Sequence, residues 1–210
     1  MDTNDEIVDS LVERGFIQSE RVEKAFRSVD RKNFVPEEQE GKAYVDTPLP
    51  IAGGSVTSAP HMIAENTELL DPDRDSRVIE IGSGSGYQVA ILAELVEEGE
   101  VLGVDVIEEL VEKSRDRLDY SNVEVFHGNG FNPVEGKFDR ILYSCAIETF
   151  DEAREHLKEN GIAVAPMYAD HAQVLRKLEN GKVTDHGFVR FMPLVEEGEE
   201  VEIPQKIYSE

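Results

Sequence analysis

The segment Arg77-Val-Ile-Glu-Ile-Gly-Ser-Gly-Ser-Gly-Tyr87 carries the strongest fold signal in the chain. Its first part, 78–81, is a short, mostly apolar run typical of a buried strand, and 87–96 has the pattern of a helix. The turn between them has glycine at every second position from Gly82 to Gly86. A strand, a glycine-rich turn and a helix in succession are typical of a doubly wound, Rossmann-like α/β sheet, which binds ligands beyond the carboxyl ends of its strands.

The alternation of strand and helix continues on the C-terminal side of this segment. Strands are predicted at 101–104, 123–126, 140–143 and 162–165, and helices at 108–118 and 151–158, the second ending at Asn160-Gly161. This pattern predicts a mostly parallel sheet covered by helices on both faces. Two further strands, at 173–178 and 188–194, with a turn at Asn180-Gly181, predict an antiparallel hairpin that closes the sheet.

On the N-terminal side, residues 1–35 predict two amphipathic helices, the second capped by Ser19. Residues 44–58 are predicted to form a loop that is too polar and too rich in Pro and Gly to belong to the core, and Pro60 to begin a helix that reaches Leu70. A loop of this length is more often functional than idle. We therefore expect one domain, 1–210, in which 1–70 forms a helical extension with a functional loop and 71–210 forms the α/β core.

The charge of the chain limits its partners and its surroundings. Acidic residues outnumber basic ones 45 to 21, for a net charge of −24, which repels phosphate and makes nucleic acid a poor partner. Because the acidic residues are spread along the whole chain, we interpret them as an adaptation to a high-salt cytosol, with ordinary acidity as the alternative. Cys145 is the only cysteine, the N-terminus has no signal-peptide pattern and no apolar run approaches the ~20 residues of a membrane span. We expect a cytoplasmic monomer.

The glycine loop predicts a nucleoside-bearing cofactor. A dinucleotide site would require a small residue where the chain has Tyr87, whereas a tighter loop that follows the acidic Glu80 suits S-adenosylmethionine (SAM), which has a sulfonium cation and no pyrophosphate. Asp105 ends the next strand, where its carboxylate would accept hydrogen bonds from both ribose hydroxyls. The alternative is a glycine-rich turn with a surface aspartate. The predicted contacts here are Glu80, Gly82, Ser83, Gly84, Ser85, Gly86 and Asp105.

Several segments together give the chain a family resemblance. They are Arg31–Val35, Ala43–Ile51, Ser58-Ala-Pro-His-Met62, Glu68–Leu70, Glu80–Tyr87, Phe138-Asp139, Pro166 and Phe191-Met-Pro-Leu-Val195. In this order they resemble the protein-L-isoaspartate O-methyltransferases over nearly the whole chain. The resemblance implies methylation of the α-carboxylate of L-isoaspartyl residues in damaged proteins, whose ester collapses to a succinimide that hydrolyses partly to normal aspartate.

The resemblance also implies roles for three residues outside the glycine loop. Ser58 would lie at the reaction centre, and the loop 44–58 would be the substrate loop, while Asn129 and Gly130 would lie at the adenine. The acceptor carboxylate has an ordinary pKa of about 4 and needs no general base, so Ser58 would act by orienting it. The alternative for Ser58 is a residue that satisfies free backbone donors at a helix N-terminus.

Three segments depart from the pattern of the family. Gly54-Ser-Val-Thr-Ser58 stands where Gly-Gln-Thr-Ile-Ser is usual, Gly128-Asn-Gly130 replaces Gly-Asp-Gly, and Cys145-Ala-Ile-Glu148 replaces an Ala-Ala-Pro segment. Two alternatives therefore stay open: a different carboxylate or small-molecule acceptor, and a non-catalytic SAM-binding paralogue. The histidines show no metal-ligand spacing, so no metal is expected. Cys145 is expected to be a small buried hydrophobe, Glu148 a solvated helix-cap acid and 196–200 a solvated acidic run.

Overall fold

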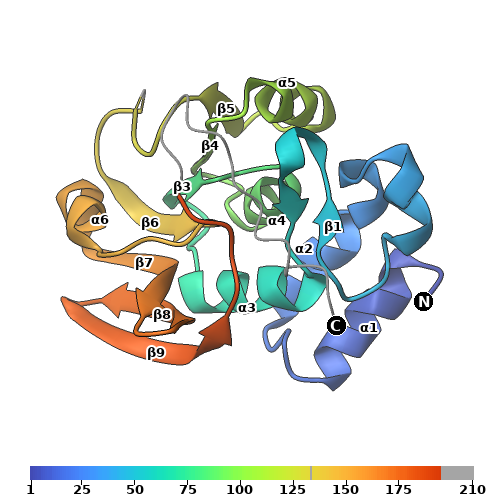
Figure 1. Cartoon of the computed structure of the whole chain (residues 1–210), viewed down its shortest axis with the longest axis horizontal. Helices are drawn as coiled ribbons and strands as arrows, with labels where there is room; N and C mark the ends of the chain where they lie inside the picture. The colour runs from blue at the N-terminus through green and yellow to red at the C-terminus, as the bar shows by residue number, and fades with distance from the viewer. Residues whose placement is uncertain (133, 195–210) are drawn as a thin grey trace.

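A seven-stranded sheet forms the centre of the protein in the computed structural model, which describes residues 1–132 and 134–194. It runs from β5 at the top of Figure 1 to β9 at the bottom, in the order β5-β4-β3-β6-β7-β8-β9. The strands are β3 (Arg77–Ile81), β4 (Glu100–Asp105), β5 (Val123–His127), β6 (Phe138–Tyr143), β7 (Leu157–Ala169), β8 (Ala172–Glu179) and β9 (Lys182–Val189). Neighbouring strands from β5 to β7 pair in parallel, whereas β8 pairs antiparallel with both β7 and β9. The predicted fold class is confirmed.

Helices cover both faces of this sheet, as the alternation of its strands requires. They are α1 (Asn4–Glu13), α2 (Glu20–Ser28), α3 (Pro60–Leu70), α4 (Tyr87–Leu95), α5 (Glu108–Arg117) and α6 (Asp151–His156). Along β3, Val78 packs into a hydrophobic cluster with α1–α4, whereas Ile79 packs into a second cluster with Ala153 of α6. Successive side chains of a strand point to opposite faces, so both faces of β3 are buried.

Two boundaries in the C-terminal part differ from the sequence prediction. The helix predicted at 151–158 ends at His156, and β7 begins directly at Leu157. Asn160-Gly161 therefore lies within the strand, where the pairing of β6 with β7 shifts register, and the prediction that it ends a helix is wrong. The strand predicted at 188–194 is also wrong for most of its length, since β9 pairs over Lys182–Val189. Most of this edge strand is exposed, so it lacks the apolar pattern of a buried strand.

The N-terminal prediction is confirmed for the helices and wrong in part for the loop. Ser19 caps α2 by accepting a hydrogen bond from the Val22 N–H at 3.3 Å. The loop contains a short antiparallel hairpin, β1 (Leu49–Pro50) with β2 (Val56–Thr57), and both Leu49 and Ile51 are buried. The 3-10 helices η1 (Arg31–Phe34) and η2 (Glu37–Lys42) precede the hairpin, and the 3-10 helix η3 (Ala52–Gly54) lies between its two strands. The loop thus contributes to the core.

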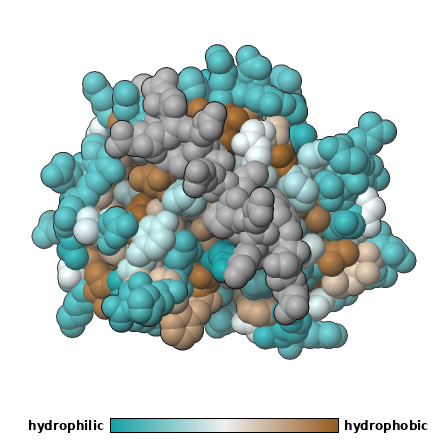
Figure 2. All heavy atoms as spheres, in the orientation of Figure 1, coloured by the Kyte–Doolittle hydropathy of each residue, from teal (hydrophilic) through white to brown (hydrophobic). Residues whose placement is uncertain are grey.

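Hydrophilic side chains form most of the periphery of the face in Figure 2, in agreement with the net charge of −24. Within the residues that the structure describes, no helix has both the length and the apolar character needed to cross a membrane. The acidic run 196–200 lies outside the described residues.

Candidate functional site

The loop between β3 and α4 depends on its glycines for its shape. Gly82, Gly84 and Gly86 have φ angles of 82°, 53° and 84°, a region that side chains with a Cβ rarely adopt. The N–H groups of Gly82 and Ser83 donate to the Val104 carbonyl at 2.8 and 3.1 Å. The loop is thereby tied to the carboxyl end of β4, at the edge of the sheet where a ligand is expected.

Asp105 is buried at the end of β4 and braces the loop. Its Oδ2 accepts a hydrogen bond from the Gly84 N–H at 2.8 Å, and its Oδ1 accepts one from the Ile107 N–H at 2.9 Å. Burial raises the pKa of this carboxyl group, and the two backbone hydrogen bonds oppose that rise. A carboxylate has further lone pairs for a ligand. The bracing role is one that the sequence analysis missed.

Glu80 is almost completely buried, with 1% of its surface exposed. Its Oε1 accepts a hydrogen bond from the Ser144 hydroxyl at 2.5 Å. Burial raises the pKa of Glu80 to about 8, and the neighbouring charge of Asp105 adds to the rise. Among the described residues, neither Glu80 Oε2 nor the Ser83 hydroxyl has a hydrogen-bond partner. Buried polar atoms without partners are costly in proteins, so these two indicate a place where a ligand supplies the missing hydrogen bonds.

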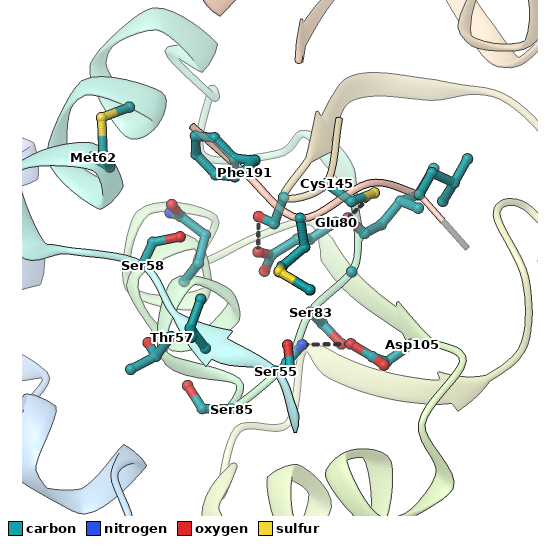
Figure 3. Close-up of a pocket in the computed structure, with 18 of the residues that line it drawn as sticks. Ser55, Thr57, Ser58, Met62, Glu80, Ser83, Ser85, Asp105, Cys145 and Phe191 are labelled. Carbon is teal, nitrogen blue, oxygen red and sulfur yellow. Dashed lines mark hydrogen bonds between the residues drawn. The ribbon is translucent and has the colours of Figure 1, made fainter. Parts of the chain in front are cut away.

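A cavity of about 470 Å³ lies above these residues, which is within the usual range for a small-molecule site. Of the predicted site residues, those that line it are Ser58, Glu80, Gly82, Ser83, Gly84, Ser85, Asp105 and Gly130. Figure 3 shows Ser58 and Met62 on one side, Ser83 and Asp105 on the other, and Glu80 between them. Gly86 and Asn129 are not among the described lining residues. A Cβ on Gly86 would lie 3.1 Å from Ser114 and Leu118, so its place is explained by helix packing.

The segment 188–194 also lines the cavity, although its sequence predicts a strand and no part in the site. The Phe191 N–H donates to Gln173 Oε1 at 2.6 Å, and Ala146 exchanges backbone hydrogen bonds with Met192 and Leu194 at 2.7 and 2.9 Å. The motif Phe191–Val195 is the sequence signal that marks this segment, but because it contains no titratable group it does not by itself indicate a part in the chemistry. Cys145 is buried, as predicted, and its side chain lies beside the cavity (Figure 3).

Ser58 does not cap the helix that follows it. The N-cap residue of α3 is Ala59, whose side chain makes no capping hydrogen bond. Asp46 takes this role, because its Oδ1 accepts hydrogen bonds from the His61 N–H at 3.0 Å and lies 2.8 Å from His61 Nδ1. The same carboxylate binds Arg14 at 2.6 Å, and these contacts hold the pKa of Asp46 well below its ordinary value. The alternative interpretation of Ser58 as a helix cap is therefore wrong.

The fold and the cavity define a Rossmann-like protein with a site for a nucleoside-bearing cofactor and an adjoining acceptor. The sequence model of the family "Protein-L-isoaspartate(D-aspartate) O-methyltransferase" matches residues 2–199. The protein-L-isoaspartate O-methyltransferase of Methanopyrus kandleri is 42% identical over 206 residues, covering 91% of each chain. That of Ignicoccus hospitalis is 40% identical over 207 residues, covering 91% of this chain and 97% of its own. The chain belongs to the protein-L-isoaspartate O-methyltransferase family.

A solved structure agrees with this membership. A Plasmodium falciparum protein described as a protein-L-isoaspartate O-methyltransferase, in complex with S-adenosyl-L-homocysteine, superposes with a TM-score of 0.82. It is 27% identical, and the match covers 92% of this chain and 98% of that one. Within the part of the chain that the structure describes, no group of three or more His, Cys, Asp or Glu side chains is placed to hold a metal ion.

Proposed function

We propose that this protein transfers the methyl group of SAM to the α-carboxylate of L-isoaspartyl residues in damaged proteins. The observation that carries the proposal is the cavity in which the serine of the substrate loop faces an acidic, glycine-rich cofactor loop. Membership of the family, with relatives of this name at 40–42% identity, gives the acceptor. We also propose that the chain forms one domain, that it acts in the cytoplasm as a monomer, and that its surface is adapted to high salt.

The described residues of the cofactor loop fit SAM. Glu80 Oε2 and the Ser83 hydroxyl are buried without partners beside the cavity, and an acidic site suits a ligand that carries an ammonium and a sulfonium group. Asp105 would hold the ribose hydroxyls, and Gly130, with Asn129 behind it, would lie at the adenine. The cofactor supplies an activated methyl group on its positively charged sulfur.

On the acceptor side, the protein has to position a group that is already reactive. A carboxylate is ionised at neutral pH and needs no base, so alignment with the methyl carbon and exclusion of water are sufficient. Ser58 donates a hydrogen bond that orients the carboxylate, and Met62 and Phe191 provide apolar walls that keep water away. Ser55, Val56 and Thr57, which replace the usual residues of the family, line the same cavity and set the shape of the acceptor pocket.

A radiolabelled methyl-transfer assay tests this function. An isoaspartyl peptide and its twin with normal aspartate are compared at low and at molar potassium chloride. We expect label only on the isoaspartyl peptide. Equal labelling of both peptides would indicate a different carboxylate acceptor, and SAM binding without any label would indicate a non-catalytic paralogue.

A further inference from the structure

Arg31 is a buried charge at the base of the substrate loop. Its exposed fraction is 0%, and although the charge of Asp46 acts on it, it makes no ion pair within 4.0 Å among the described residues. Burial lowers the pKa of its guanidinium group to about 10, which leaves it charged at neutral pH. Removing a charge from water costs several kcal/mol unless hydrogen bonds compensate, so the position of this arginine requires an explanation.

The two terminal nitrogens are compensated by backbone carbonyl groups of a single segment, while Nε has no partner among the described residues. Arg31 Nη1 donates to the carbonyls of Ala43 at 2.8 Å and Val45 at 3.2 Å. Its Nη2 donates to the carbonyls of Thr47 at 3.0 Å and Ser58 at 3.1 Å. The contacts thus join both ends of the substrate loop, and the Ser58 backbone is one of them. Because a guanidinium group is planar and rigid, it fixes these carbonyls relative to one another, which the ammonium group of a lysine would not do.

The short helix that carries Arg31 packs beside the cofactor loop. Tyr87 is the first residue of α4, directly after the glycine loop. Phe34, which ends η1, packs on the Tyr87 ring with centroids 5.6 Å apart. Arg31 and its short helix therefore connect the start of α4 with the backbone that carries Ser58.

We propose that Arg31 is a positioning residue for the acceptor site: by binding the carbonyls of the substrate loop and of Ser58, it sets the distance between the Ser58 hydroxyl and the cofactor loop. The proposal rests on the function proposed above. It assigns to Arg31 no contact with either substrate. Its effect on methyl transfer therefore passes through Ser58.

Arg140 offers a matched control. It too is a buried arginine that binds backbone carbonyls, those of Leu70 at 2.8 Å and Asp71 at 2.9 Å, and it also pairs with the exposed carboxylate of Asp73 at 3.1 Å. It is not among the described residues that line the cavity. Arg140→Lys should therefore reproduce the general cost of removing a buried guanidinium group without disturbing Ser58.

The experiment compares Arg31→Lys, Arg140→Lys, Ser58→Ala and the double variant Arg31→Lys/Ser58→Ala. We expect Arg31→Lys to lower kcat/KM for an isoaspartyl peptide about 10- to 100-fold, with SAM affinity changed less than about threefold. Arg140→Lys should lower the melting temperature but change kcat/KM less than about threefold. The free-energy effects of two substitutions that act through the same group are not additive. In the Ser58→Ala background, Arg31→Lys should therefore lower kcat/KM by less than about a further threefold. Losses that multiply in the double variant would overturn the proposal.

Hydrogen exchange gives a readout that does not depend on methyl transfer. Amides of the segment 43–58 should exchange faster in Arg31→Lys than in wild type, and at the wild-type rate in Arg140→Lys. Unchanged exchange of 43–58 in Arg31→Lys would overturn the proposed role of Arg31, whatever the enzyme activity. Failure of the wild type to methylate isoaspartyl peptides would instead contradict only the proposed function. If Arg31→Lys does not fold, Arg31→Gln, which has two donors and no charge to bury, takes its place in both measurements.

Discussion

The buried carboxyl group of Glu80 should make SAM binding depend on pH. Its pKa of about 8 follows from burial and from the nearby charge of Asp105. At pH 7, about nine tenths of the free protein therefore carries a proton at this group. Because Oε2 has no partner among the described residues and lies at a site for a cation, binding should favour the ionised form and expel the proton.

The sign and the size of the effect follow from linkage. The pKa of Glu80 is high in the free protein and falls in the complex, so affinity rises with pH until the free protein is itself ionised above about pH 8. If the pKa returns to its ordinary value of about 4.5 in the complex, the contribution of Glu80 to the apparent affinity should increase about tenfold from pH 6 to pH 7 and about 100-fold from pH 6 to pH 9. The amino group of SAM, with an ordinary pKa of about 8, titrates in the same range and weakens binding at the upper end, equally in a variant that lacks the Glu80 carboxyl group. About 0.9 proton should be released per SAM bound at pH 7.

Calorimetry in two buffers with different ionisation enthalpies measures both quantities. Glu80→Gln is the matched control, since an amide can still accept the Ser144 hydrogen bond but cannot titrate. The other ionisable neighbours that the structure describes are Asp105 and Cys145, and burial raises the pKa of the Cys145 thiol, so this group stays protonated from pH 6 to 9. The same pH dependence of SAM affinity in the wild type and in Glu80→Gln, without extra proton release in the wild type at pH 7, would refute the reasoning.

Three further predictions concern binding, stability and turnover. Asp105→Ala should weaken SAM binding by about 1–3 kcal/mol and also lower the melting temperature, because the Gly84 and Ile107 N–H groups lose their acceptor; unchanged affinity in calorimetry would exclude this placement of the ribose. The melting temperature of the wild type should rise from dilute to molar potassium chloride, because salt screens the self-repulsion of a net charge of −24; a flat or falling curve would argue for ordinary acidity. Ser58→Ala should slow methyl transfer about 10- to 1000-fold with little change in SAM affinity and no covalent adduct on the wild-type serine; a wild-type rate would remove Ser58 from the reaction centre.

The features predicted from the sequence are those that depend on neighbouring residues. The glycine loop and Asp105 could be found because a strand, a turn and a helix follow one another directly, and the position of Asp105 at a strand end brings it to the loop. The hairpin turn was found because Asn180 and Gly181 adopt positive φ angles that few other residue types favour. These predictions are local ones.

The features that the sequence analysis missed depend on contacts between distant residues. Arg31 would ordinarily be expected on the surface, and its burial is possible only because carbonyls 12 to 27 positions later converge on it. The place of 188–194 depends on hydrogen bonds with Gln173, which lies on β8, and with Ala146, which lies beyond the end of β6. Gly161 resembles a helix stop, but it lies within β7, where a Cβ would be 2.6 Å from Leu157. Such pairings have no signature in a short window of sequence.

The two sides of the cavity share one physical device, and the proposed reaction explains why. On the cofactor side, a buried carboxylate, Asp105, accepts the N–H of the glycine loop, and on the acceptor side, a buried guanidinium, Arg31, donates to the carbonyls of the substrate loop. A buried charge holds firmly the backbone to which it is hydrogen-bonded. If the backbone moved away, the charge would be left without hydrogen bonds in a medium of low polarity. Transfer of a methyl group between a sulfonium and an ionised carboxylate needs no proton transfer, so its rate depends mainly on the distance and alignment of the two groups. A protein for this reaction therefore needs two rigid loops facing each other more than it needs an acid or a base, and in our proposal Asp105 and Arg31 supply that rigidity.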